Sequence, residues 1–213
     1  MIDLFLKGGP VMYPLLVCSV IAMAVVIERV IFWIQSDRLR NQALVDEVLE
    51  LCRVGNWDMV RIKVAGSKDY LIRILVGGIL HREFSMTKAM ESAASDEIRN
   101  MRRYMGVLDT IITVAPLLGF LGTVTGIILS FESLGKNVIE HPETVAMGIA
   151  QALITTAAGL IIAILTVFPY NYFNSRIEDA ALSIEKYATS LEIVYKKLVQ
   201  GTNDKDNDKE VYE

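Results

Sequence analysis

The sequence predicts an all-α membrane protein with three transmembrane helices and a helical cytoplasmic domain, in which spans two and three extend into the cytoplasm. The first observation is composition: 53% of the 213 residues are hydrophobic and 22% are charged, which is typical of long spans joined by a water-exposed domain. The second is three apolar runs that each exceed the about 20 residues needed to cross a bilayer as a helix. The third is a helical spacing of apolar residues between the first and second runs.

The expected segments follow one another without an inserted domain. They are an N-terminal lead-in (1–10), transmembrane helix 1 (11–34), a cytoplasmic helical domain (35–106), transmembrane helix 2 (107–133), a periplasmic turn (134–143), transmembrane helix 3 (144–169), a cytoplasmic helical extension (170–200) and a disordered tail (201–213). The tail is expected to be disordered because it is polar, charged and poor in core residues.

The first apolar run is interpreted as a span rather than as a cleaved signal peptide. It is longer than the signal-peptide core of about 7–15 residues, and its Ala-Met-Ala triplet (22–24) lies inside the run rather than after it. Near its end, Glu28 and Arg29 are interpreted as a structural charge pair, and a proton-handling Glu28 is the alternative. Trp33 is expected to be an interfacial aromatic anchor.

The cytoplasmic domain alternates short helical patterns with turns. Its apolar stretch 70–80 is too short to span a bilayer, so we expect a packed helix there. Ser85 is the expected N-cap of a later helix, whose apolar face continues to Met105. We expect that helix to run straight into the second span.

The helix of span three is expected to continue beyond Pro169. Its apolar residues alternate spacings of four and three as far as Leu198, which is typical of a helix packed along another helix. The partner is either the cytoplasmic extension of span two or a second copy of the chain.

Basic residues near the span ends indicate orientation. Arg38 and Arg40 follow span one and Arg102 and Arg103 precede span two, whereas the turn between spans two and three contains only Lys136. By the positive-inside rule, the large loop and the C-terminus are cytoplasmic and the N-terminus is periplasmic.

Spans two and three each carry a face of small residues at helical spacing. The small face of span two is Ala115, Gly119, Gly122 and Gly126, and that of span three is Gly148, Ala152, Gly159 and Ala163. Lipid provides no hydrophobic drive between helices, so small residues that let backbones approach favour packing of these two spans. Pro116 predicts a kink, and it leaves the Ile112 carbonyl to be satisfied by Thr113, a water or a neighbouring helix.

Hydroxyl residues are frequent in both spans, and most are expected to bond to their own helix. Thr123 and Thr156 are the expected exceptions, because each lies on or beside a small face and can line a polar path. A proton path generally needs a titratable group near the middle of the membrane. Asp109 and Glu132 lie near the ends of span two, and Gln151 cannot carry a proton as a carboxylate does. If protons cross here, another chain supplies the acid.

No catalytic constellation, metal site, cofactor or nucleic-acid surface is expected. His81 and His141 lie on opposite sides of the predicted membrane, and the span-two glycines do not follow a strand as a phosphate loop requires. The net charge of -4 comes from interspersed charges of both signs, which argues against nucleic acid. Cys18 and Cys52 are interpreted as unpaired structural cysteines. An enzyme is therefore not expected.

Three motifs resemble those of the MotA/TolQ/ExbB proton-channel proteins. They are Gly8-Gly-Pro10 through Glu28-Arg29, the segment APLLGFLGTVTG (115–126) and the segment GIAQALITTAAG (148–159). The last two are specific in combination, and the three-span layout covers the chain to about Leu198. Three spans rather than four argue against a flagellar MotA-type stator, and the first segment is more similar to ExbB than to TolQ.

The resemblance implies a proton-channel and motor subunit of the bacterial cytoplasmic (inner) membrane. It implies a homopentamer around the single-span helices of an ExbD-like partner, which carries the membrane aspartate, and a TonB-like protein through which proton motive force drives outer-membrane transport. By motif position, Thr123 and Thr156 correspond to the pore threonines of the family, with Thr155 beside them. Gln151 occupies a position where some ExbB proteins have glutamate, which leaves Thr156 and ordered water as the better relay candidates.

Other functions remain open from the residues alone. A TolQ-like subunit for envelope maintenance would share the same motifs. A structural membrane scaffold would use the small faces for packing alone, whereas a self-sufficient channel or transporter would make Glu28 or Asp109 essential.

Overall fold

The computed structural model describes residues 5, 7–136 and 142–210, and these residues contain helices and no strand. The helices are α2 (Met12–Leu39), α3 (Gln42–Arg53), α4 (Trp57–Val64), α5 (Tyr70–Leu80), α6 (Arg82–Met101), α7 (Met105–Lys136) and α8 (Pro142–Glu210). Three of them, α2, α7 and α8, contain stretches long and apolar enough to cross a membrane. The expected all-α fold with three spans is therefore confirmed.

The chain divides into two units, which we describe separately. The first unit contains residues Met1–Val30 and Arg103–Asn174, and the second contains Ile31–Arg102 and Ser175–Glu213. The first unit holds the apolar parts of α2, α7 and α8, and the second holds the four shorter helices with the last parts of α2 and α8.

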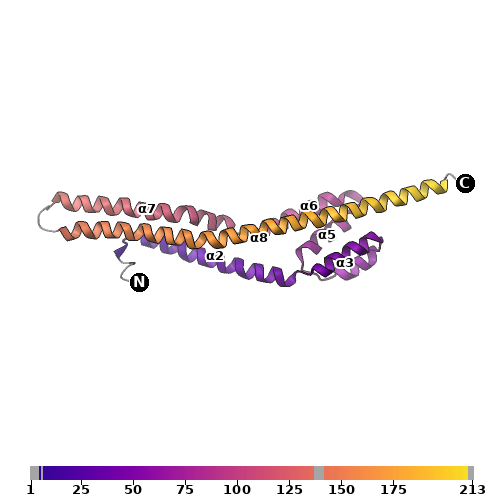
Figure 1. Cartoon of the computed structure of the whole chain (residues 1–213), viewed down its shortest axis with the longest axis horizontal. Helices are drawn as coiled ribbons and strands as arrows, with labels where there is room; N and C mark the ends of the chain where they lie inside the picture. Colours follow the sequence, from indigo (N-terminus) through magenta and orange to yellow (C-terminus); the bar gives the residue numbers. More distant parts are fainter. Residues whose placement is uncertain (1–4, 6, 137–141, 211–213) are drawn as a thin grey trace. The chain divides into compact units, whose positions relative to one another are not determined.

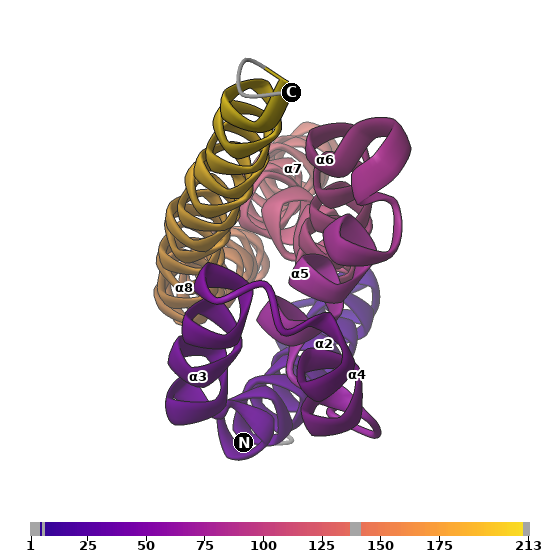
Figure 2. The ribbon, with the colours of Figure 1, turned by 90° about the vertical axis from the view of Figure 1, so that its right-hand side faces the viewer.

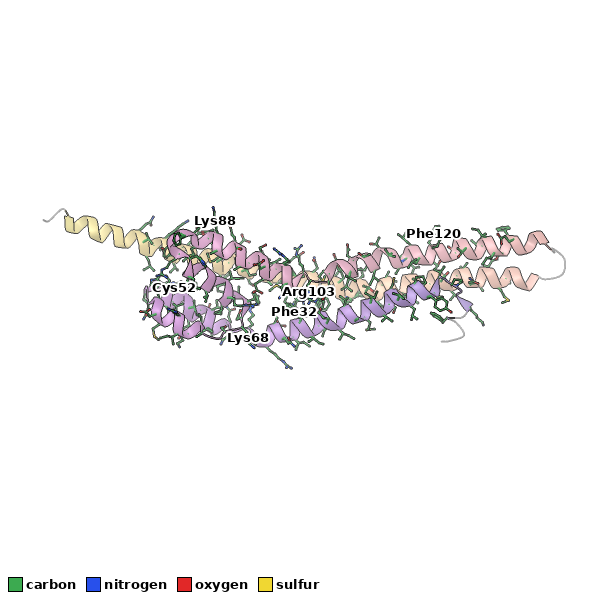
Figure 3. The ribbon with its side chains drawn as sticks, turned by 180° about the vertical axis from the view of Figure 1, so that it is seen from behind. Phe32, Cys52, Lys68, Lys88, Arg103 and Phe120 are labelled. Atoms are coloured by element: carbon green, nitrogen blue, oxygen red, sulfur yellow. The ribbon has the colours of Figure 1, made fainter. Side chains whose placement is uncertain are left out.

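In the first unit, α7 and the apolar part of α8 run side by side, and the first part of α2 lies along α8 (Figure 1). Helices are the expected solution, because a chain in lipid must satisfy its backbone hydrogen bonds internally. Large apolar side chains face outward, and one of them, Phe120, is 65% exposed (Figure 3). Residues 137–141 of the expected periplasmic turn lie outside the described residues.

In the second unit, α5 forms the core, and α6 packs against it (Figure 2). Most of α5 is buried, namely Tyr70, Leu71, Ile72, Ile74, Leu75, Gly78 and Ile79. A β-carbon added at Gly78 would lie 2.9 Å from Met90 Sδ, so the glycine allows α6 to approach closely. The expected packed helix at 70–80 is thus present. Cys52, labelled in Figure 3, is also buried here, and burial raises the pKa of its thiol to about 11.

Asp69 joins two helix starts in this core. It is 1% exposed, and its carboxylate accepts hydrogen bonds from the Leu71 amide at 2.9 Å and from the Asn41 amide at 2.8 Å. Asn41 in turn caps α3, because its side chain accepts from the Leu44 amide at 3.1 Å. One buried acid therefore fixes the N-termini of both α5 and α3.

The cytoplasmic part of α8 packs on short helices of its own chain. The Tyr195 hydroxyl donates to the Arg82 carbonyl at 3.2 Å, the Tyr195 ring meets Trp57 edge to face, and the Tyr187 hydroxyl pairs with Gln42. Tyr195 of the predicted apolar repeat thus has its partners in the 35–106 segment of the same chain, and not in span two or in a second copy.

The expected continuous helix from Ser85 into the second span is wrong, because α6 ends at Met101 and α7 begins at Met105. Between them, Tyr104 has a φ of 64°, which a right-handed helix does not allow. The N-cap expected at Ser85 is present: its backbone is extended (φ -163°) and its hydroxyl accepts from the Lys88 amide at 3.4 Å.

Two further expectations differ from the structure. Trp33 is not an exposed interfacial anchor: it is 6% exposed, and the Arg176 guanidinium lies 4.9 Å from its ring centroid. This cation–π contact and the Arg176–Asp37 ion pair place the indole inside the protein. In the expected disordered tail, α8 continues to Glu210, and the segment contains no proline that would end it.

Candidate helix interface and proton pathway

The small faces of α7 and α8 meet at backbone distance. A β-carbon added at Gly119 would lie 3.0 Å from the Thr155 carbonyl oxygen, and one at Gly126 would lie 2.8 Å from the Gly148 carbonyl oxygen. At Gly159 it would lie 3.1 Å from the Gly119 α-carbon. Such separations leave no room for a side chain, so the two helices touch through their main chains.

The predicted small residues all lie at or near this contact. Buried members are Ala115, Gly119, Gly122, Gly126, Ala152, Gly159 and Ala163. Gly148 is half-buried and packs against Ser130 and the Gly126 carbonyl. We call this contact the glycine seam.

Thr155 and Thr156 both reach the seam but serve different helices. Thr155 is fully buried against Gly122, and its hydroxyl donates to carbonyls of its own helix, at Ala152 (2.9 Å) and Gln151 (3.2 Å). The Thr156 hydroxyl instead crosses the seam and donates to the Gly119 carbonyl at 3.0 Å. Thr156 therefore bonds α8 to α7.

The Thr123 hydroxyl does not cross to α8. It donates to the Phe120 carbonyl at 2.6 Å, and the side chain is half-buried. Other span hydroxyls with printed bonds do the same within their own helix, among them Thr110, Thr113, Thr125, Ser130 and Thr166. Of the two expected exceptions, Thr156 alone bonds across helices among these described contacts.

Gln151 lies against the lead-in to α2 rather than in the seam. A β-carbon added at Gly9 would lie 2.7 Å from Gln151 Cδ, and Gly9 has a φ of 72°. Gly8-Gly9-Pro10 is part of the first motif that resembles the proton-channel family. The side-chain contact with Gln151 has no sequence signal beyond those glycines.

The structure brings Glu28 and Arg29 together in a forked pair. Arg29 Nε and Nη2 donate to the two Glu28 oxygens at 2.5 Å and 2.6 Å. The Arg29 side chain is 1% exposed, and the Tyr104 ring centroid lies 5.7 Å from its guanidinium carbon. The Glu28 side chain is 44% exposed. The guanidinium is thus held between a carboxylate and an aromatic face.

Around Pro116, α7 remains helical. Thr113 donates to the Asp109 carbonyl at 3.1 Å and so serves a carbonyl other than that of Ile112. A kink at Pro116 remains a prediction.

The site offers hydroxyls, an amide and backbone carbonyls, but little acid. Within the described parts of α7 and of α8 as far as Pro169, the carboxylates are Asp109 and Glu132, close to the ends of α7, and Glu143 at the start of α8. No group of three or more potential metal ligands occurs among the described residues. The chemistry available near the middle of these helices is hydrogen bonding between neutral groups.

Comparison with known proteins gives matches that include these helices. A model of the MotA/TolQ/ExbB proton channel family matches residues 70–186, more than half of the chain. The putative biopolymer transport protein ExbB-like 3 of Synechocystis sp. is 36% identical over 200 residues, which cover 90% of this chain and 93% of that protein.

Two shorter matches carry different names. The biopolymer transport protein ExbB of Pseudomonas putida is 48% identical over 93 residues, or 40% of this chain and 28% of that protein. The Tol-Pal system protein TolQ of Pseudomonas aeruginosa is 34% identical over 119 residues, or 56% of this chain and 52% of that protein.

Proposed function

Because this chain belongs to the MotA/TolQ/ExbB proton channel family, we propose that it is the proton-channel and motor subunit of an ExbB–ExbD-like inner-membrane complex. The complex converts proton motive force into work for TonB-dependent outer-membrane transport. No catalytic reaction is assigned to the chain.

The observation that carries this proposal is the extent of the ExbB-like match. It covers 90% of the chain, whereas the TolQ match covers 56%. A TolQ-like role in envelope maintenance is the second candidate, supported by that shorter match.

The polar groups of the first unit support a path that needs a partner. Thr156 presents a hydroxyl at the seam, Thr155 and Thr123 lie near it, and Gln151 lies one helical turn before Thr155. Protons moving along such neutral groups and ordered water need a titratable acid nearby. An ExbD-like single-span protein supplies it as a membrane aspartate.

The same proposal sets the assembly and the orientation. Large apolar side chains cover the outside of α2, α7 and α8, and the bilayer and neighbouring copies cover them in a homopentamer. Arginines near the ends of spans one and two support, by the positive-inside rule, an N-terminus in the periplasm and a C-terminus in the cytoplasm.

The test combines composition with conduction. The full chain is tagged at its C-terminus, extracted mildly from its own membranes and weighed by native mass spectrometry. We expect five copies together with a small single-span protein that has a membrane aspartate. The complex is then reconstituted in lipid vesicles, and a potassium diffusion potential drives proton flux across the vesicle membrane. A pH-sensitive dye measures this flux.

Thr156→Val is the decisive variant, and Thr166→Val is its matched control. Both changes remove one hydroxyl from α8, but Thr166 donates to the Ile162 carbonyl of its own helix at 2.7 Å. We expect Thr156→Val to reduce proton flux at least tenfold in an assembled complex, with Thr166→Val close to the unchanged chain. Equal flux in the two variants would overturn the role of Thr156.

The same experiment separates the other classes of function. A homo-oligomer with no co-purified single-span protein and no proton flux would indicate a structural scaffold. Flux from the chain alone, lost on Glu28→Gln or Asp109→Asn, would indicate a self-sufficient channel.

A further inference from the structure

The turn before α2 makes a close contact with α8. Gly9 has a φ of 72°, in the left-handed region that favours glycine. A β-carbon added there would meet the Gln151 amide, at 2.7 Å from Cδ and 3.3 Å from Oε1. Any side chain at position 9 would therefore displace Gln151.

The turn is itself held in place. The Gly9 carbonyl accepts from the Met12 amide at 3.1 Å, and the Pro10 carbonyl accepts from the Tyr13 amide at 3.2 Å. Gly8 is buried, and a β-carbon added to it would lie 2.7 Å from Met12 Sδ and 3.4 Å from Ile154 Cγ2. The Gly8–Pro10 turn is thus fixed to the start of α2 and rests on α8.

Gln151 is connected to the seam on its other side. Its carbonyl accepts from the Thr155 hydroxyl at 3.2 Å, and the next residue, Ala152, packs against Gly126 across the seam. The backbone of Gln151 is therefore linked to the seam, and its side-chain amide lies against Gly9.

We propose that Gly9 is a positioning residue for the Gln151 amide. The bare backbone of Gly9 forms one wall of the space that this amide occupies, and it keeps the amide donor and acceptor at one place on α8. A hydrogen-bonded path depends on such a fixed position, because displacement of about 1 Å breaks a hydrogen bond. The effect on proton flux rests on the proposed function, whereas the contact itself does not.

The contact is tested first by a spectroscopic titration that needs no proton flux and no partner. Gln151→Glu puts a carboxyl of nearly the same shape against Gly9, and infrared spectroscopy of the full chain in lipid nanodiscs follows its protonation with pH. Adding Gly9→Ala should shift the titration midpoint by at least about one pH unit, a tenfold change in proton affinity.

Gly55→Ala is the matched control. Gly55 has a φ of 69°, almost that of Gly9, but a β-carbon added there meets nothing within 4 Å. The same alanine strain is therefore introduced without a neighbour. An unchanged midpoint with Gly9→Ala, or an equal shift with Gly55→Ala, would overturn the proposal.

A second measurement covers the case in which Gly9→Ala alone does not fold. Adding Gln151→Ala removes the amide and makes room, so the double variant should recover the folded yield of the Gly55→Ala chain. If the double variant does not recover its folded yield, the loss of yield in Gly9→Ala comes from backbone strain alone. This result would overturn the role of Gly9 in positioning Gln151.

Proton flux then connects the contact to function. In the reconstituted complex, Gly9→Ala with native Gln151 should lower flux at least fivefold and Gly55→Ala should not. Unchanged flux with a shifted infrared midpoint would overturn the part of the proposal that concerns the proton path. If the unchanged complex conducts no protons, the proposed function fails while the titration still decides the contact.

Discussion

Replacing Gly126 by alanine tests the glycine seam directly. The added methyl group would lie 2.8 Å from the Gly148 carbonyl oxygen and 2.9 Å from the Ala152 β-carbon. Because one neighbour is backbone, the clash cannot be relieved by a side-chain rotation alone, and α7 and α8 must separate. Gly106, in the same helix, is the matched control, since a β-carbon added there meets nothing within 4 Å.

The two substitutions should change stability in opposite directions. Overpacking a close contact costs about 1–3 kcal/mol. Alanine in place of an exposed helical glycine stabilises by up to about 1 kcal/mol, because it restricts the unfolded chain. The two variants should therefore differ by about 1–4 kcal/mol in free energy of unfolding, roughly fivefold or more in the folding equilibrium.

Stepwise addition of SDS to the protein in mixed lipid–detergent micelles, followed by circular dichroism, measures this difference. Gly126→Ala should unfold at a lower SDS fraction than the unchanged chain, and Gly106→Ala at an equal or higher fraction. If Gly126→Ala and Gly106→Ala unfold at the same SDS fraction, the close approach of α7 and α8 does not stabilise the first unit.

Two predictions concern the second unit. Burial, partly offset by Arg73, raises the pKa of Glu97, so this carboxyl contributes stability that is fully present below its ordinary pKa and is lost as pH rises through the folded value. Glu97→Gln should therefore make melting temperature fall less between about pH 4 and about pH 8 than in the unchanged chain, and parallel pH profiles would contradict this. Asp69→Ala should cost about 2–4 kcal/mol in urea unfolding, because the Leu71 and Asn41 amides lose a buried, charged acceptor. The exposed cap variant Asn56→Ala should cost only about 1 kcal/mol, and equal losses would refute the role of burial.

Composition and periodicity were sufficient to predict the three spans, the packed helix at 70–80 and the faces of small residues on spans two and three. Each of these depends on the local spacing of residue types. The break at Tyr104 could not be predicted in this way. The apolar period passes through Met101 and Met105 without a glycine or proline, and nothing in that spacing signals a positive φ.

Contacts between residues that are far apart in the sequence also could not be predicted from the spacing of apolar residues. An aromatic residue near a span end usually marks the membrane interface, but Trp33 is buried under Arg176, which lies far along the chain. The same limit applies to Gly9 and Gln151, since glycine next to proline indicates a turn and says nothing about the side chain packed against it.

The glycine seam also constrains how the sequence can change. At Gly122 the neighbour is the Thr155 side chain, so a larger residue on α7 can be compensated by a smaller one on α8. At Gly159 the neighbours are the Ala115 carbonyl and the Gly119 main chain, and no residue is smaller than glycine. Genetic suppressors of a Gly122 variant therefore have a partner position available, whereas a variant at Gly159 is left with reversion.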